Sequence, residues 1–235
     1  MLEVRFFARD ALQVAQDLLG KVIRVKYQRW WLSASIIETE AYYLNEKGSH
    51  SSLGFTEKRK ALFMPAGTIY MYYARGGDSL NISCQGAGNA VLIKSGLPYQ
   101  DDSSPPHTIK IMQRLNPKRN QTLRTPERVC SGQTLLCRSL GLRVTEWDQQ
   151  VFNPHRFFIE DCGYTVNKII QTRRLGIPSG RDEHLLYRFI DYQRAEFCTD
   201  NPLRKRRWQL NQDYFIKNPC PFQPIHIQNL SRRLP

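Results

Sequence analysis

Apolar residues along the chain follow two different periods, which predict helices in some segments and strands in others. After Asp10, the apolar residues of 11–19 recur at helical spacing, so we expect a helix that Asp10 caps and Gly20 ends. Residues 21–27 and 30–42 are instead rich in β-branched and aromatic side chains, with a two-residue polar turn between them. This pattern predicts an antiparallel hairpin.

The middle of the chain continues with strand-like runs. Residues 68–83 contain alternating tyrosines followed by Gly76 and Gly77, which predicts a second hairpin that turns at the glycines. An apolar strand is expected at 89–94. The polar residues 44–60 are expected to form a loop ahead of the second hairpin.

The second half of the chain predicts two helices and further strands. Ile109, Met112 and Leu115 lie on one face of a predicted helix, and Ser131 is expected to cap a second helix rich in leucine. Residues 151–192 alternate short apolar runs with turns, which is typical of strands. Together these elements predict an α+β fold, a single domain with a curved, mostly antiparallel mixed β-sheet flanked by helices.

Length and composition indicate one domain with a basic extension. A chain of 235 residues with 41% hydrophobic content can bury a full core, and no linker divides it. The character changes at residue 201, where RKRR at 204–207 is followed by several prolines. We expect a main domain at 1–200 and a basic C-terminal extension at 201–235 that packs on it or trails from it. The extension either grips phosphate or is a solvated run of charge.

The formal net charge of +13 indicates a polyanionic partner, because so many unpaired cations repel one another. Nucleic acid is the favoured partner. An anionic membrane surface is disfavoured, since the sequence shows neither a basic amphipathic anchor nor a transmembrane helix. The N-terminal residues lack the apolar core of a secretion signal, so we expect an intracellular protein.

The six cysteines are scattered along the chain, without a CxxC motif or a Cys/His pair at zinc spacing. In a reducing compartment, such cysteines are by default small buried apolar residues. We therefore expect neither disulfides nor a metal site.

Candidate chemistry lies toward the end of the strand predicted at 30–42. Glu38 and Glu40 are one alternation apart, so their side chains are expected to share a face. A carboxylate at the end of a buried strand can lie in a partly dry cleft, where desolvation raises its pKa toward that of a general base. The alternative is that both glutamates are solvated at a sheet edge.

Aromatic and polar residues near these acids in the sequence could converge on one pocket. They are Tyr42, Tyr43, His50, Tyr70, Tyr72 and Asn81. Aromatic walls with a carboxylate behind them suit a flat, nitrogen-rich ligand such as a nucleobase. Lys94, at the end of its predicted strand, faces either this cleft or solvent.

These segments resemble the alkyladenine DNA glycosylase family, also called the 3-methyladenine DNA glycosylases. The resemblance covers most of residues 5–190. One short motif alone would be weak evidence, but several motifs in the same order are specific to the family. The motifs follow the family's order with nearly its spacing: ETEAY at 38–42 and then a histidine, MPAGTIYMY at 64–72, NIS at 81–83, VLIKSGLP at 91–98, CSGQTLLCRSLGL at 130–142, RRLGI at 173–177 and YRF at 187–189.

The resemblance implies which residues act on the water. Glu40 corresponds to the glutamate that activates the water displacing the damaged base, which leaves Glu38 with a structural role. The carbonyl of Leu175 is implied to help hold that water. The family usually has an arginine where Lys94 stands, helping to position the water; lysine keeps the charge but loses the planar fork.

The resemblance also implies which residues receive the base. The family clamps a flipped base between aromatic side chains and a histidine, which correspond to Tyr42, Tyr72 and His50. Asn81 is implied to inspect the edge where guanine carries its amino group.

Two further positions depart from the family pattern. Arg75 stands where the family inserts a tyrosine into the duplex, in a hairpin one residue shorter. We expect Arg75 to act as this wedge, because an arginine can stack against bases and hydrogen-bond to the base that was paired with the flipped nucleotide. Leu135 replaces a lysine that is often present, which weakens one phosphate contact.

The implied activity is that of a monofunctional DNA glycosylase in DNA repair, acting as a monomer on double-stranded DNA without a cofactor. It would flip out 3-methyladenine, 7-methylguanine, hypoxanthine or ethenoadenine and hydrolyse the N-glycosidic bond, leaving an abasic site. The expected location is the bacterial cytoplasm at the nucleoid, or otherwise the nucleus. Two alternatives stay open: a non-catalytic or degenerate basic nucleic-acid-binding protein, and an enzyme acting on RNA or free nucleosides.

Overall fold

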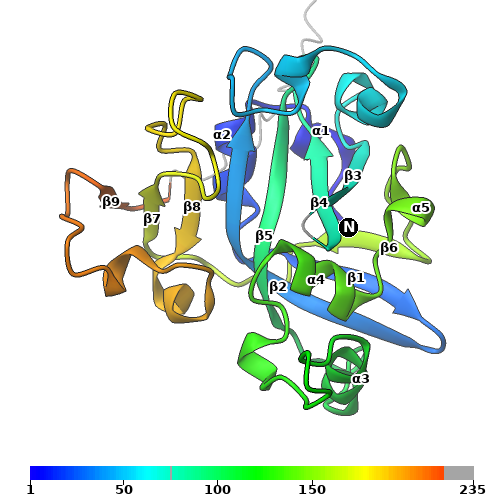
Figure 1. The fold of residues 1–235 in the computed structure, drawn as a ribbon. Coiled ribbons are helices and arrows are strands. Elements are labelled where there is room, and N and C mark those ends of the chain that lie inside the picture. Colours follow the sequence, from blue (N-terminus) through cyan, green and yellow to red (C-terminus); the bar gives the residue numbers. More distant parts are fainter. Residues whose placement is uncertain (75, 220–235) are drawn as a thin grey trace, which may run out of the picture.

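A single long strand organises the sheet. Strand β2 (Trp30–Tyr42) pairs along one edge with β5 (Ala90–Pro98). Along its other edge, the first half of β2 pairs with β1 (Val22–Tyr27) and the second half with β8 (Arg188–Asp191). Figure 1 shows β2 and β5 side by side, with β7 to β9 on one side of them and β3 and β4 on the other.

The structure, a computed structural model, describes residues 1–74 and 76–219. Its nine-stranded sheet has the order β3-β4-β5-β2-β8-β7-β9, with β1 between β2 and β6, and every pair of these strands is antiparallel. The α+β fold predicted from the pattern is confirmed. The remaining strands are β3 (Ile69–Ala74), β4 (Gly77–Ser83), β6 (Phe157–Glu160), β7 (Ile169–Thr172) and β9 (Tyr214–Lys217).

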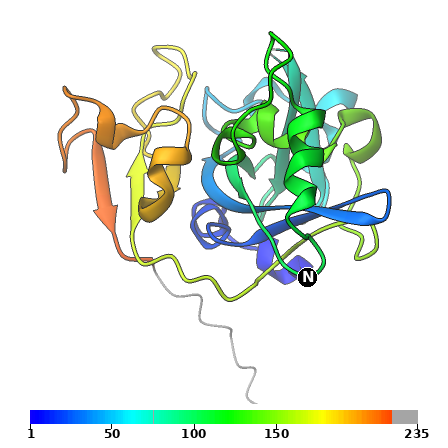
Figure 2. The ribbon, with the colours of Figure 1, turned by 90° about the horizontal axis from the view of Figure 1, so that it is seen from below.

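Helices cover the sheet. The α-helices are α1 (Val4–Phe7), α2 (Ala11–Asp17), α3 (His107–Leu115), α4 (Gln133–Leu140) and α5 (Val144–Trp147). Figure 2 shows α3 and α4 on the opposite side of the molecule from β7 and β9. Short 3₁₀ helices occupy Ser51–Leu53, Glu57–Phe63, Pro126–Arg128, Tyr192–Phe197 and Pro202–Arg204.

The helix starts test the predicted caps. The carboxylate of Asp10 accepts hydrogen bonds from the amides of Leu12 and Gln13, so its predicted cap is confirmed, although α2 ends three residues before Gly20. The cap predicted at Ser131 is wrong. Its amide donates to Arg128 O in the preceding turn, and α4 begins after Gly132 without a side-chain cap.

Three segments differ from the predicted pattern. Residues 44–60 contain two 3₁₀ turns, and the strand expected at 89–94 extends to Pro98 because Gly96 and Leu97 continue its pairing with β2. Residues 151–152 form no strand. The part of the predicted extension that the structure describes contributes β9, which pairs with β7; residues 220–235 lie outside the described residues.

A break in the alternation of side-chain direction along β2 determines which face of the sheet carries Glu38 and Glu40. Ile36 and Ala41 both belong to the main core under the helices, and Thr39 donates to Ala15 O of α2 on the same side. A regular strand could not put residues 36 and 41 on one face. The register shift between Ile36 and Glu38 is a β-bulge that reverses the facing, so Glu38 and Glu40 point away from the main core.

The second face of β2 is also covered. A smaller apolar cluster there contains Ile37, Ile170 and Ile190, from β2, β7 and β8. Because both faces are covered, the middle of β2 is dry, and the side chains of Glu38 and Glu40 are fully buried. The alternative of two solvated glutamates at a sheet edge is therefore wrong.

Candidate active site

Glu40 is held by groups from three parts of the chain. Its Oε2 accepts a hydrogen bond of 2.7 Å from the hydroxyl of Tyr42, and its Oε1 accepts one of 3.0 Å from the amide of Leu175. The Nζ of Lys94 lies 3.4 Å from Oε1. The structure thus brings Leu175 to the carboxylate through its amide N–H; the water-holding role of its carbonyl stays a prediction.

Glu40 is ionised at neutral pH. Burial acts to raise its pKa, but the charges of Lys94 and Arg188 and the hydrogen bonds from Leu175 and Tyr42 outweigh it, so the pKa lies below its ordinary value. Desolvation thus acts in the expected direction, but the expected net rise of this pKa toward that of a general base is wrong. A buried carboxylate that keeps its charge can take a proton from water or stabilise a nearby positive charge.

Glu38 is saturated by protein groups. Its oxygens accept hydrogen bonds from Arg188 Nε (2.6 Å) and Ser95 Oγ (2.5 Å), and from both the amide and the hydroxyl of Thr199. Arg188 is itself fully buried and also donates to Thr199 O. The arrangement ties β2 to β5, β8 and the segment after β8.

A second bulge brings Lys94 to the site. Ser95 pairs with Glu38 and Ile93 pairs with Thr39, which leaves Lys94 out of register between them. The side chains of Lys94 and Ser95 consequently reach the same side of the sheet, one to each glutamate. This settles the orientation of Lys94, which faces the acid rather than solvent.

A cavity of about 330 Å³ opens above Glu40. Its size is at the lower end of the range for small-molecule pockets, about 300–1,000 Å³. Three residues that contact Glu40 form part of its wall: Tyr42, Lys94 and Leu175. The other lining residues come from the loop after β2, from β3, β4, β5, α4 and the 176–181 loop: Gly48, Ser49, His50, Leu53, Leu62, Tyr70, Tyr72, Asn81, Ala90, Leu92, Gln133, Gly176, Ile177, Pro178 and Arg181.

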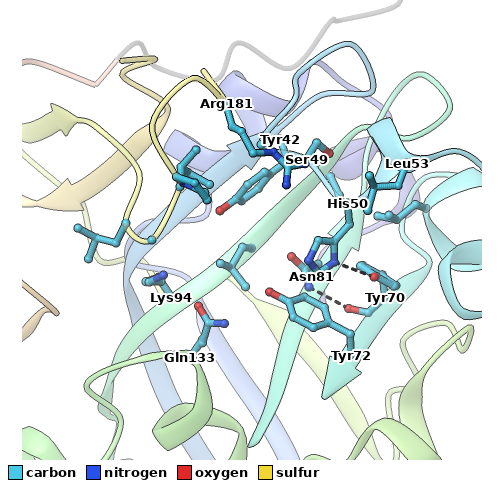
Figure 3. A pocket seen from close by; sticks show the side chains of 18 residues that line it. Tyr42, Ser49, His50, Leu53, Tyr70, Tyr72, Asn81, Lys94, Gln133 and Arg181 are labelled. Atoms are coloured by element: carbon cyan, nitrogen blue, oxygen red, sulfur yellow. Dashed lines mark hydrogen bonds between the residues drawn. The ribbon is translucent and has the colours of Figure 1, made fainter. Parts of the chain in front are cut away.

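The predicted base-binding residues meet in this cavity. Figure 3 shows Tyr42 across the cavity from His50 and Tyr72. The His50 and Tyr72 rings lie 4.4 Å apart, and His50 Nδ1 is 3.1 Å from the Tyr70 hydroxyl. Asn81 donates from Nδ2 to Tyr70 O, 3.2 Å away, which orients its amide. Burial and the charges of nearby arginines lower the pKa of His50, so its imidazole is neutral at neutral pH.

Arg174 supports Tyr42 from behind, a role that the sequence did not reveal. Its guanidinium carbon lies 4.5 Å from the Tyr42 ring centroid, and its Nη1 donates to Ala41 O and to the carboxylate of Glu46. Arg174 precedes Leu175, so one short segment both backs the aromatic wall and donates to Glu40. The RRLGI motif was the available signal, but only the carbonyl of its leucine, Leu175, had an implied role.

Two further lining residues were also missed. Gln133, the first residue of α4, donates from Nε2 to Ser79 Oγ at 2.8 Å, and Arg181 donates to Lys47 O on the opposite rim. Both residues are far from the ETEAY segment in the sequence, so the sequence alone did not predict that they lie near it in the fold. The predicted wedge Arg75 lies outside the described residues.

Within residues 1–74 and 76–219, no group of three or more His, Cys, Asp or Glu side chains is placed to hold a metal ion. No helix in that part of the chain is long and apolar enough to span a membrane.

Comparison with known proteins shows the family to which this chain belongs. The profile of the methylpurine-DNA glycosylase family matches residues 5–195. A protein of Pseudomonas syringae pv. tomato, provisionally named a 3-methyladenine DNA glycosylase, is 61% identical over 215 residues, covering 92% of this chain and 96% of the relative.

Two further relatives agree with that result. A protein of Pseudomonas aeruginosa UCBPP-PA14 with the same provisional name is 62% identical over 95% of this chain and 92% of its own length. One from the archaeon Methanocella arvoryzae, again so named, is 31% identical over 79% of this chain and 90% of its own. The chain belongs to the methylpurine-DNA glycosylase family, whose members are hydrolases of N-glycosyl bonds in DNA.

Proposed function

We propose that the protein excises alkylated or deaminated purines from double-stranded DNA, using water that Glu40 activates. The substrates proposed are 3-methyladenine, 7-methylguanine, hypoxanthine and ethenoadenine, and the product is an abasic site. The observation that carries this proposal is a fully buried carboxylate whose contacts Tyr42, Lys94 and Leu175 all line an aromatic cavity.

The chemistry follows from charge. Cleavage of an N-glycosidic bond develops positive charge on the sugar, so an adjacent carboxylate both orients the attacking water and stabilises the transition state. Lys94 and the Tyr42 hydroxyl keep Glu40 ionised and hold it in place. Glu40 acts on water, so the strand is left uncut at the abasic site.

The walls of the cavity favour a damaged base. A purine alkylated on a ring nitrogen carries positive charge, and stacking between Tyr42 and Tyr72 stabilises that charge by cation–π attraction. The neutral imidazole of His50 adds no repulsion. The amide of Asn81, oriented by its bond to Tyr70 O, is proposed to oppose the amino group of guanine and so to spare undamaged guanine.

Base release is the direct test. Duplexes that each carry one of the four lesions, and an intact duplex, are incubated with the protein in excess, and free base is quantified by chromatography. We expect release of at least one lesion base and none from the intact duplex. Glu40→Gln keeps the size of the side chain and is expected to abolish release while lesion-duplex binding persists. Release by Glu40→Gln at the normal rate would refute the mechanism, and a wild-type protein that binds duplex but releases nothing would refute the activity.

A further inference from the structure

A basic groove lies between the loop at 117–124 and the start of α4. Its cavity measures about 510 Å³. Four cationic side chains line it, those of Lys118, Arg119, Arg124 and Arg138, and no Asp or Glu is among the described residues that do so. We refer to the surface formed by these four side chains as the basic groove.

The charge of the basic groove is not neutralised by described residues. Within 1–74 and 76–219, none of its four cations forms a salt bridge, whereas the buried Arg24, Arg174 and Arg188 each pair with a carboxylate. The remaining residues of the sequence contain no Asp or Glu side chain. Four neighbouring cations without an acidic partner attract an anion from outside the chain.

The groove is held in shape by the protein itself. Two backbone hydrogen bonds of 2.9 Å, from Lys118 to Thr122 and from Gln121 to Lys118, close the loop. Arg138 donates from Nη2 to Gly76 O at 3.0 Å, which fixes its guanidinium at the hairpin turn. The Nε of Arg124 is buried and has no hydrogen-bond partner among the described residues, a cost that a bound anion nearby would offset.

The groove adjoins the base cavity. Gln133 lines the cavity and the next residue, Thr134, lines the groove, so the first turn of α4 is a wall of both. The first residue of β4 packs against α4 so closely that a Cβ on Gly77 would lie 2.0 Å from Thr134 Cγ2. A polymer whose base occupies the cavity therefore has its neighbouring backbone within reach of the groove.

We propose that the basic groove binds the phosphodiester backbone of duplex DNA next to the flipped nucleotide. The inference rests on the proposed function, because that function supplies duplex DNA as the ligand. Lysine and arginine contacts to phosphate position a duplex without reading its sequence, so the groove sets the register in which the damaged base meets the cavity. Its contribution is independent of the lesion and depends strongly on salt.

The test removes two exposed cations of the loop and compares them with a matched pair elsewhere. Lys118→Gln with Arg119→Gln is the groove variant. Lys26→Gln with Arg29→Gln is the control, because these exposed residues lie at the β1–β2 turn against Trp31 and Trp30, and the net charge falls equally. Dissociation constants are measured against salt concentration for a hypoxanthine duplex and for its intact counterpart.

In the groove variant, we expect the slope of log Kd against the logarithm of the salt concentration to become less steep. The decrease should be roughly 0.9 for each lost phosphate contact and equal for both duplexes. The control should keep the wild-type slope. Lys118→Arg with Arg119→Lys exchanges the two cations and should keep it as well. Thermal unfolding of each variant shows that the fold is retained. A groove variant with the wild-type slope, or with the same loss as the control, would overturn the proposal.

The base-release assay separates this proposal from the function on which it rests. At saturating protein, the groove variant should release base at the wild-type single-turnover rate, and only the protein concentration for half-maximal rate should rise. A slower rate at saturation would place the groove in the chemical step and contradict a binding role. If no protein releases base while the slopes differ as expected, the proposed function fails and the phosphate site stands.

Discussion

Glu38 and Glu40 lie two residues apart on β2, are both fully buried, and have different surroundings. The oxygens of Glu38 receive donors from Arg188, Ser95 and Thr199, which leaves it no direction open to a ligand. Glu40 is held by Tyr42, Leu175 and Lys94, all of which line the cavity. Burial is thus common to both acids, and only the second is in contact with residues that line the cavity.

The largest expected effect comes from breaking the structural member of the pair. Glu38→Gln removes the carboxylate that forms a salt bridge with the fully buried Arg188, which should cost about 3–5 kcal/mol of unfolding free energy. Urea unfolding measures the loss. The single-turnover rate of the molecules that remain folded should be nearly unchanged, and a folded, fully stable but inactive Glu38→Gln protein would reverse the roles we assign.

Shortening the other acid should affect catalysis instead. Glu40→Asp retains the charge but withdraws the carboxylate by one methylene from the Leu175 amide and the Tyr42 hydroxyl. Because small misplacements of a reacting group cost about 100-fold, we expect a fall of that order in the single-turnover rate. Binding of a lesion duplex should persist, and a rate equal to that of the wild type would show that the position of this carboxylate is unimportant.

A smaller effect on the rate is expected from removing Lys94, the cation that lies beside Glu40 and lines the cavity. Lys94→Gln loses a charged contact worth about 1.5 kcal/mol, so the rate at neutral pH should fall about tenfold. It also raises the pKa of Glu40, so the acid limb of the rate, expected below pH 4.5 in the wild type, should move upward. Lys94→Arg should restore the limb; a pH profile identical in all three proteins would exclude this coupling.

The same pKa difference predicts how stability depends on pH. The pKa of Glu40 is lower in the folded protein than its ordinary value of 4.5, so Glu40 stabilises the fold above that pH. The contribution is lost as the pH falls through the folded-state pKa. Urea unfolding between pH 7 and pH 3 should therefore show a weaker acid-dependent loss in Glu40→Gln than in the wild type. An equal loss in both proteins would mean that other carboxylates account for it.

The smallest effect is expected at Tyr42. Tyr42→Phe keeps the ring that Arg174 backs but removes the hydroxyl that donates to Glu40. A hydrogen bond to a charged group contributes about 1.5 kcal/mol, and Lys94 and the Leu175 amide still hold the carboxylate, so the rate should fall by no more than about tenfold with little change in duplex affinity. Tyr42→Leu is the companion variant, since it removes the stacking surface and should weaken binding of a cationic lesion more than binding of hypoxanthine. Equal behaviour of the two variants would argue against separate roles for the hydroxyl and the ring.

Local patterns in the sequence predicted most of the secondary structure. The β1–β2 and β3–β4 hairpins, the Asp10 cap and the helix around Met112 were all predicted, because each depends on the spacing of nearby apolar residues and on turn chemistry. Ser131 shows the limit of such patterns. A serine before a leucine-rich run is a plausible cap. In the structure, however, Ser131 still belongs to the turn that precedes α4, and Gly132 is the N-cap residue.

The candidate site was only partly accessible from the sequence. The family resemblance pointed to Glu40, Tyr42, His50, Tyr72 and Asn81, and their side chains meet at or directly beneath one cavity. Their catalytic and binding roles stay predictions. Gln133 and Arg174 could not be placed in the site beforehand, since they contact it only after distant strands and helices have assembled.

What the sequence determined by itself was the periodicity: which segments form strands or helices, and that two acids end a buried strand in a strongly basic chain. The tertiary structure alone decided which way those acids face and in which direction the pKa of Glu40 is shifted. Strict alternation would have put Glu38 and Glu40 on the face of Ile36, in the apolar core, and the bulge at residue 37 turned them away from it. The charges of Lys94 and Arg188, brought in by β5 and β8, then reversed the effect of burial on the pKa of Glu40, because electrostatic stabilisation depends on distances in space that no local pattern encodes.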